Sequence, residues 1–451
     1  MRDVIAQSLI MDEIDIDQQR IRPAVVFING AYWGIYGLRE MFNKHYVESH
    51  HGVDKDNIDL LGDPYGPGSQ VREGDFERYD EMMNFVDNNA LSVSSNYEEM
   101  REFIDIQEYL NYHITQIYFA NYDQPGNNVR IWRDRDGGKF RWMLFDTDAS
   151  TGWDSWGAQV GKATHNTLQH MLNDENIGGV PGFPQWPNGP ESTYLFRKLI
   201  ENEDFENELI QRMCTFRELI FAPQRVLPMV DSLENLLLPE MQRHITSWLG
   251  NNQFGVGTPS GGSVAQWQNI VDNYRSFFNN REFHIKFIFQ NTLGLDGRYD
   301  LTFGYDQTTL GDVVIHENEM AIPYNYEGEY FQNIPIRLKA VPKPGYYFSH
   351  WLETGQTTAV INYVNSEDAI ITPVFSDQPV ATTEIDVNLN IKIYPNPAQE
   401  QIYIEISDLE DTASITFFDV LGKELLQTVV SREVSTLEIS QLPSGMCLVK
   451  I

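Results

Sequence analysis

Residues 121–148 read NYDQPGNNVRIWRDRDGGKFRWMLFDTD, and this stretch predicts a β-hairpin with polar side chains at its open end. Residues 129–132 and 140–145 are rich in β-branched and aromatic side chains, as strands are. Asp136-Gly137 lies between them and is a strong signal for a two-residue hairpin turn. The two strands are therefore expected to run antiparallel, which brings the ends of the stretch together.

The register of this hairpin places an amide opposite a carboxylate. With the turn centred there, Asn127 is expected to face Asp146, and Asn128 is expected to face Phe145. Directly paired residues lie about 4.5–5.5 Å apart, so an Asn and an Asp at this end are within reach of one cation.

A helix is expected upstream, because residues 104–119 carry apolar side chains at helical spacing behind Asp105, a typical N-cap. This helix would deliver Asp123 to the open end of the hairpin. Asp123 and Asn128 have the spacing of the base and the metal-binding Asn of protein kinases, in which a further Asp, here Asp146, follows. The same residue types are common in turns and helix caps, so the spacing alone leaves a structural role open.

Four blocks of the chain resemble the CotH kinase-like family, named for a bacterial spore coat protein. The first is the Asn-Tyr-Asp and Phe-Asp-Thr-Asp pattern described above. The second, VVFINGAYWGIYGLRE at residues 25–40, is similar to that family's strand, Asn-Gly turn and second strand ending in an acidic residue. The others are Gly74 with residues 71–73 and the helical stretch 195–205. The resemblance is spread over residues 1–295.

This resemblance implies an atypical kinase fold that binds ATP with Mg²⁺ or Mn²⁺ and phosphorylates Ser or Thr of a protein substrate. Matched by motif, Asp123 corresponds to the catalytic Asp and Asp146 to the metal-binding Asp. Asn128 is the candidate Asn on the metal and nucleotide side. Asp148 is a further candidate near the metal, and Glu40 is a candidate for organising the nucleotide phosphates.

The chain departs from the family pattern at its start. Family members carry an extended region with a glycine turn and a nucleotide-contacting basic residue before the segment that matches residues 2–6. No such region precedes this segment, which predicts a truncated chain or an incomplete ATP site. The first residues, MRDVIAQSLIMDE, also lack the features of a signal peptide.

The composition is strongly acidic, with 65 Asp and Glu against 32 Lys and Arg and a formal net charge of −33. Nucleic acids and anionic membranes are bound through clustered Lys and Arg, so neither is expected as a partner. Apolar runs are too short to predict a transmembrane segment. The two cysteines, Cys214 and Cys447, predict neither a disulfide framework nor a metal site.

Residues 151–193 are predicted to form a loop rich in Trp, Gly and Pro, either the wall of an acceptor groove or a plain surface insertion. Apolar periodicity then predicts helices over about 194–222, 225–250 and 263–291.

From residue 296 to 376 the pattern changes to short alternating strands, which predicts a small β-rich module. Its Gly-Tyr-x-Phe-x-x-Trp stretch, residues 345–351, resembles repeat modules of bacterial surface proteins. Trp351 is expected in the core of this module, and glycan binding through Trp351 is the alternative.

A polar linker at residues 377–388 leads to a last module over residues 389–451. Its IKIYPNP, ITFFDVLGK and LPSGMCLVKI stretches resemble the C-terminal sorting domain of the type IX secretion system. Alternating strands and turns predict a small β-sandwich there. Met446-Cys447 replaces the usual aromatic residue and the final strand is missing after Ile451, so an incomplete domain is expected. The resemblance implies handling by the type IX machinery and a secreted or cell-surface protein.

The sequence thus predicts an α+β fold, with an atypical protein-kinase-like domain, a small all-β module and a C-terminal β-sandwich sorting domain. The leading functional prediction is a secreted or cell-surface kinase in which Asp123 acts on the acceptor hydroxyl. The alternatives are a non-catalytic adhesin or scaffold on a degenerate kinase fold, or a glycan-binding protein.

Overall fold

The computed structural model describes most of the chain. The described residues are 2–65, 69–124, 126–152, 162–174, 189–248, 262–304, 310–316, 320–323, 325–378, 391–398, 400–406, 413–418, 424–430, 434–440, 442 and 448–450. Helices and strands are mixed as far as residue 293 and only strands follow among the described residues, as expected for an α+β protein. The chain forms two compact units, residues 1–378 and 379–451, which are described separately.

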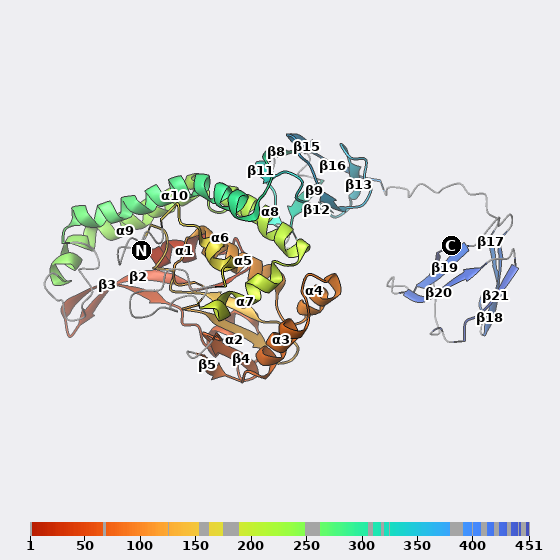
Figure 1. Ribbon diagram of the computed structural model, residues 1–451, viewed down its shortest axis with the longest axis horizontal. Coiled ribbons are helices and arrows are strands. Elements are labelled where there is room, and N and C mark those ends of the chain that lie inside the picture. The colour runs from red at the N-terminus through yellow and green to blue at the C-terminus, as the bar shows by residue number, and fades with distance from the viewer. Residues whose placement is uncertain are drawn as a thin grey trace. The chain divides into compact units, whose positions relative to one another are not determined.

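The first unit contains a five-stranded sheet, whose strands β4 and β5 are labelled in Figure 1. Its strand order is β1-β7-β6-β4-β5, and β1 runs parallel to β7 while the other neighbours are antiparallel. The strands are β1 (Asp17–Gln18), β4 (Ile58–Gly62), β5 (Gln70–Glu73), β6 (Arg130–Asp134) and β7 (Arg141–Leu144).

Helix α5 (Ile106–Tyr118) is the predicted helix upstream of Asp123. Asp105 caps it, as predicted, because its side chain accepts a hydrogen bond from the Glu108 N–H at 3.2 Å. The helix packs against β7 and against α8 (Glu203–Leu219), and its residues are almost all buried. Four further helices precede it: α1 (Arg2–Ile10), α2 (Lys44–His51), α3 (Glu77–Asn88) and α4 (Ser94–Met100).

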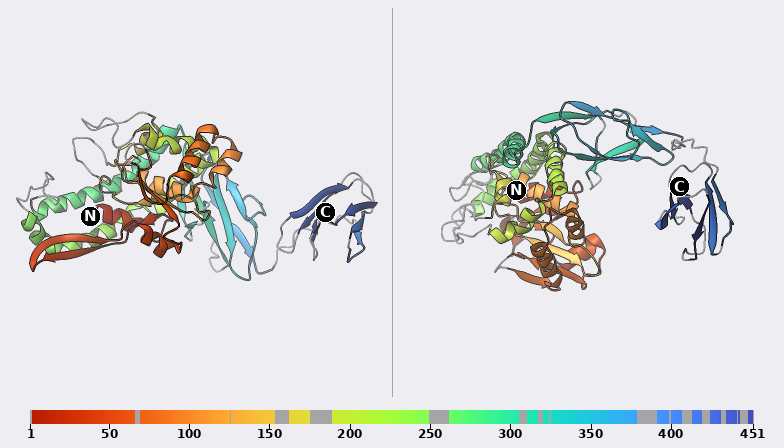
Figure 2. Two further views of the ribbon diagram at one scale, coloured as in Figure 1. Left: turned by 90° about the horizontal axis from the view of Figure 1, so that it is seen from below. Right: turned by 45° about the vertical axis from the view of Figure 1, so that its right-hand side comes forward.

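The predicted helix over 194–222 is two helices, α7 (Pro190–Leu199) and α8. The break occurs because the Asn202 side chain caps α8, accepting hydrogen bonds from the N–H groups of Asp204 and Phe205. The other two predicted helices are confirmed as α9 (Pro223–Trp248) and α10 (Val264–Leu293), which lie side by side along one flank (Figures 1 and 2). The short α6 (Thr167–Leu172) packs against α7 and α10.

The second family-like block forms a long hairpin of β2 (Ile21–Ile28) and β3 (Ala31–Arg39). Asn29 and Gly30 turn the chain with φ of 51° and 81°, as an Asn-Gly hairpin turn requires. The hairpin lies along α9 (Figure 2), where His244 Nδ1 accepts a hydrogen bond from the Ile35 N–H at 3.0 Å. Its strand β3 ends at Arg39, beside the candidate site.

The predicted β-rich region contains nine strands among the residues that the structure describes. They are β8 (Arg298–Phe303), β9 (Gly311–Ile315), β10 (Met320–Ala321), β11 (Glu327–Phe331), β12 (Ile336–Pro342), β13 (Tyr347–Trp351), β14 (Val360–Tyr363), β15 (Ala369–Ile371) and β16 (Pro373–Ser376). They form sheets of four, three and two strands. Helix α8 packs on β11 and β12, so the strands share one hydrophobic core with the helices.

Trp351 is fully buried in this region, as predicted. Its indole N–H donates to the Thr358 carbonyl at 3.1 Å. A buried indole cannot stack on a sugar, so the alternative of glycan binding through Trp351 is wrong. The Trp-rich part of the predicted loop, with Trp153, Trp156 and Trp186, lies outside the described residues.

The second unit is the predicted β-sandwich. Its sheets have the orders β17-β18-β21 and β20-β19-β22, and buried Ile402 and Ile404 of one meet Ile415 and Phe417 of the other. The strands are β17 (Ile391–Tyr394), β18 (Gln401–Ile406), β19 (Ala413–Phe418), β20 (Glu424–Val430), β21 (Val434–Glu438) and β22 (Leu448–Lys450). Met446-Cys447 lies outside the described residues. Within the described part of the chain, no helix has the length and apolar character needed to cross a membrane.

Candidate functional site

Asp123 lies directly beside the Asp146-Thr-Asp148 segment because backbone hydrogen bonds tie the two loops together. The Tyr122 N–H donates to the Ala149 carbonyl at 3.1 Å, and the Thr151 N–H donates to the Phe119 carbonyl at 2.8 Å. The chain leaving α5 therefore runs against the chain leaving β7.

The predicted hairpin register is confirmed in its centre, where Ile131 pairs with Trp142 and Trp132 pairs with Arg141. It does not continue to the polar end, where Asn127 was expected to face Asp146. Asn128 and Asp146 both adopt left-handed backbone conformations, with φ of 57° and 54°, which end the two strands. The ladder prediction is therefore wrong at this end.

The asparagines contact Asp123 instead. The Asn127 and Asn128 side-chain amides donate to Asp123 Oδ2 at 3.4 and 3.3 Å, and the Asn127 N–H donates to the Asp123 carbonyl at 2.9 Å. Asp63 fixes the next residue, because its carboxylate accepts from the Val129 N–H at 2.9 Å. The five-residue spacing from Asp123 to Asn128 thus closes a loop around the Asp123 carboxylate.

A clamp formed by α1 holds the Asp-Thr-Asp segment. Asp3 Oδ1 accepts hydrogen bonds from the Thr147 N–H at 3.1 Å and from the Thr147 hydroxyl at 2.9 Å. Thr147 is fully buried, whereas Asp146 is half-buried and Asp148 is exposed. Fixing Thr147 therefore fixes both neighbouring carboxylates at the surface.

Burial and the charges of neighbouring carboxylates raise the pKa of Asp123 and of Asp146. Burial raises the pKa of Asp123 to about 6, and the negative charges of Asp148 and Asp146 add to the effect while Asn127 opposes it. Burial also raises the pKa of Asp146, helped by the charges of Asp148 and Asp3 and opposed by Arg39. We call these four residues, Asp3, Asp123, Asp146 and Asp148, the acidic cluster.

Glu40, the remaining predicted site residue, contacts a different set of groups. Its Oε1 lies 2.9 Å from His50 Nε2, and its Oε2 accepts from the Arg20 N–H at 2.9 Å. The adjacent His51 Nε2 lies 2.6 Å from Oδ1 of buried Asp17. His50 and His51 therefore end helix α2 and hold it against two carboxylates.

Oxygen-donor chemistry at the acidic cluster fits a hard divalent cation such as Mg²⁺ or Mn²⁺. The pKa of Asp123 and of Asp146 is raised in part by neighbouring negative charge, which a bound cation would neutralise. Across the described residues, no three His, Cys, Asp or Glu side chains are already gathered closely enough to hold a metal. The chemistry of the donors therefore fits such a cation.

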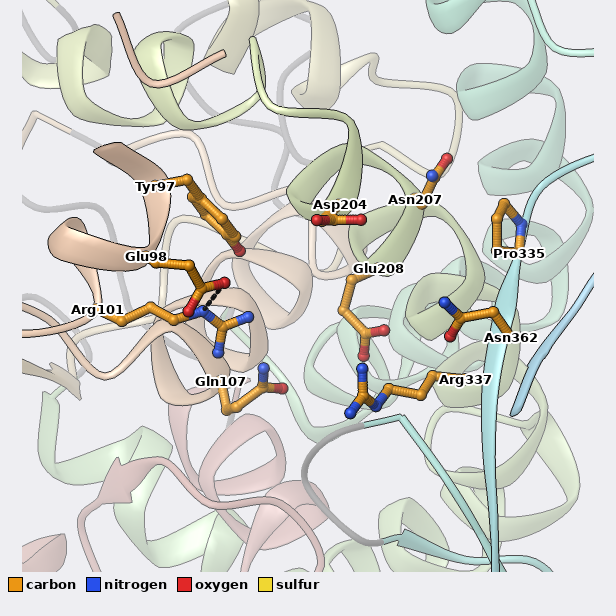
Figure 3. A pocket seen from close by; sticks show the side chains of 10 residues that line it. All are labelled: Tyr97, Glu98, Arg101, Gln107, Asp204, Asn207, Glu208, Pro335, Arg337 and Asn362. Carbon is orange, nitrogen blue, oxygen red and sulfur yellow. Dashed lines mark ion pairs between the residues drawn. The ribbon is translucent and has the colours of Figure 1, made fainter. Parts of the chain in front are cut away.

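A separate cavity of about 220 Å³ lies between α4, α8 and strands β12 and β14 (Figure 3). Asp204 and Glu208 of α8 face it, with Arg101 on one side and Arg337 on the other, and Arg101 pairs with Glu98 at 3.5 Å. None of the predicted site residues lines this cavity. It belongs to the contact between the helices and the β-rich region.

Comparison with known families decides the identity of the larger part of the chain. The model of the family described as CotH kinase protein matches residues 1–285. The chain belongs to this family. No curated protein matches the CotH-family chain.

The end of the CotH-family protein matches a second model, that of the secretion system C-terminal sorting domain, over residues 392–451. This domain is handled by the type IX secretion machinery, so the protein is exported to the cell surface or secreted.

Reasoning from the sequence missed Asp3, Thr147 and Arg39 as members of the site. Asp3 and Thr147 are 144 positions apart, and no local pattern signals such a contact. Arg39 directly precedes Glu40, and the alternation of side chains along a strand was the available signal that the two face opposite ways.

Proposed function

We propose that this CotH-family protein is an exported phosphotransferase with an atypical kinase fold, which transfers phosphate from ATP to Ser or Thr of a protein substrate. One observation carries the proposal: Asp123, with a pKa raised to about 6, lies among Asp146, Asp148 and the Asn128 amide within the family-matched region. A base with a pKa just below the working pH is well suited to take a hydroxyl proton.

Asp123 is the proposed base of the reaction. The acceptor hydroxyl oxygen forms a bond to the terminal phosphorus of ATP, and the bond from that phosphorus to the bridging oxygen of ADP breaks. ADP leaves with the electron pair, and the hydroxyl proton passes to Asp123. The Asn127 and Asn128 amides, which donate to Asp123 Oδ2, orient the carboxylate for this transfer.

Asp146, Asn128 and Asp148 are the proposed residues that hold Mg²⁺ or Mn²⁺ with the nucleotide. The metal supplies neutralisation of the phosphate charge. Asp3 keeps Thr147 in place between the two carboxylates through two hydrogen bonds. Glu40 stays a predicted nucleotide-side residue, and its contacts to His50 and Arg20 support a role in shaping the end of β3.

The test is transfer of the terminal phosphate of labelled ATP to protein, including to the protein itself, with and without Mg²⁺ or Mn²⁺. We expect metal-dependent labelling by the wild type and a loss of roughly 100-fold or more in Asp123→Asn and in Asp146→Asn. Asp272→Asn is the matched control, since Asp272 is an exposed carboxylate of α10 paired with Arg275. Equal labelling by the wild type and Asp146→Asn would refute the metal assignment.

A non-catalytic surface protein is the second candidate. It is favoured by the absence, among the described residues, of side chains already gathered around a metal position. It is also favoured by exposed apolar side chains on the β2–β3 hairpin, such as Phe27, Trp33 and Leu38. This candidate predicts no metal-dependent ATP binding, whereas the phosphotransferase requires it.

A further inference from the structure

Arg39, the last residue of β3, brings a positive charge to the acidic cluster. Its Nη1 lies 2.8 Å from Asp3 Oδ2, and its charge lowers the pKa of Asp146 against the effects of burial and of Asp148. We propose that Arg39 binds the phosphate groups of the nucleotide and that Asp3 positions it. This inference rests on the proposed function and adds a binding residue to it.

The environment of Arg39 leaves it accessible to a ligand. Its side chain is 41% exposed, whereas that of Asp3 is only 8% exposed. Among the described residues, Asp3 is its one ion-pair partner, and that contact uses Nη1. A guanidinium has five N–H donors in a planar fork that matches phosphate oxygens. Nη1 of Arg39 is thus held by Asp3, while the other N–H groups of the guanidinium are available to an anion.

The direction of the side chain distinguishes Arg39 from its neighbour. Successive side chains point to opposite sides of a strand. Arg39 contacts Asp3, while Glu40, directly after β3, contacts His50 and the Arg20 N–H. Of this adjacent pair, Arg39 is therefore the one on the side of the acidic cluster.

Asp3 links this arginine to the proposed metal ligands. One carboxylate oxygen holds Thr147, between Asp146 and Asp148, and the other holds Arg39. The almost fully buried Asp3 side chain therefore sets the distance between the Arg39 guanidinium and the segment that carries Asp146 and Asp148. Arg2, the neighbour of Asp3 on α1, has its guanidinium over the Tyr274 ring at 5.1 Å. Arg39 is accordingly the better-placed group for a phosphate.

The experiment compares equilibrium binding of ATP and of adenosine, each with Mg²⁺, to the wild type, Arg39→Gln and Arg39→Lys. Gln keeps a donor for Asp3 but removes the charge, and Lys keeps the charge but not the planar fork. We expect Arg39→Gln to weaken ATP binding roughly 10-fold or more, because it removes charge-assisted hydrogen bonds, and to leave adenosine binding unchanged. Arg39→Lys should recover part of the ATP affinity. Arg22→Gln is the control, since Arg22 is exposed on the neighbouring strand.

The outcomes separate this inference from the function on which it rests. If the wild type and Arg39→Gln bind ATP equally well, the role of Arg39 is refuted and the phosphotransferase proposal stands. An equal loss of ATP and adenosine binding would show that Arg39 acts only on the structure and would also refute the inference. If the wild type binds no ATP, both proposals fall.

Discussion

At the scale of single residues, the raised pKa of Asp123 makes a prediction about catalysis. A base must be deprotonated to accept a proton, and burial raises the pKa of Asp123 to about 6. The phosphate-transfer rate should therefore increase with pH through about 6 and level off above it. The measurement is a pH profile of kcat/KM, which reports ionisation of the free enzyme before the metal and nucleotide bind. A rate that stays constant from about pH 5 to about pH 8, a range that spans this pKa, would contradict the assignment.

The same shift predicts that Asp123 costs stability. Its pKa is about 6 in the fold against 3.8 when unperturbed, so the folded state binds more protons between these values. Stability is therefore lost as pH rises through this window, and the charged Asp123 destabilises the fold above it. Asp123→Asn should raise the free energy of unfolding at neutral pH by about 1–2 kcal/mol after allowance for partial exposure.

Chemical denaturation of both proteins at a series of pH values checks this prediction. The stability gain of Asp123→Asn should shrink as the pH falls toward about 4, which is close to the unperturbed pKa of Asp. A gain that is independent of pH, or a variant less stable than the wild type at neutral pH, would show that the charged form of Asp123 does not destabilise the fold.

At the scale of elements, Arg281 of α10 fixes the end of α5 from which Asp123 emerges. Its guanidinium, fully buried, donates to the carbonyls of Tyr118 at 2.9 Å and Ile117 at 2.6 Å. It also donates to the carbonyls of Ala163 and His165, both at 2.7 Å. One side chain thus joins a helix end, the loop before α6 and α10.

Removal of Arg281 should therefore destabilise the first unit strongly. Arg281→Ala leaves buried carbonyls without donors, and we expect a loss of about 3 kcal/mol or more in the free energy of unfolding. Arg275→Ala on the same helix is the control, with an expected loss of about 1 kcal/mol or less because its carboxylate partners are partly exposed. Similar losses for the two variants in denaturant titrations would contradict this reading.

The elements of the site that could be predicted from the sequence are those set by local patterns. The Asp105 cap and the central hairpin register depend on neighbouring residues, and the structure confirms them. The predicted two-residue turn at Asp136-Gly137 is wrong, because the strands stop pairing at Trp132 and Arg141 and the Gly138 N–H donates to the Asp134 carbonyl in a longer loop. The polar end of the hairpin could not be predicted, because left-handed residues end the strands where a regular ladder was expected. The hydrogen bonds of Asp3 to Thr147 and of Arg281 to the end of α5 join segments that are far apart in the chain. No local sequence pattern signals such contacts, so they could not be predicted.

At the scale of the whole molecule, the two compact units carry separate tasks. The site belongs to residues 1–378, while the sorting domain has its own small core in residues 379–451. Deleting residues 379–451 should leave the melting temperature of the first unit unchanged, because each unit has its own core. In a host with the type IX machinery, the deletion should also abolish surface display or secretion.

Cell fractionation and thermal melting check the two parts of this prediction. Normal export of the shortened protein would contradict the role of the tail. A large drop in the melting temperature would show that the first unit depends on the sorting domain for its stability.

The central claim is that the acidic cluster holds a divalent metal together with ATP. The most direct measurement is calorimetric titration of ATP into the wild type, Asp146→Asn and Asp272→Asn, with and without Mg²⁺. We predict Mg²⁺-dependent binding to the wild type and to Asp272→Asn, and binding roughly 10-fold or more weaker in Asp146→Asn. ATP binding that is unaffected by Mg²⁺ and equal in all three proteins would contradict the claim.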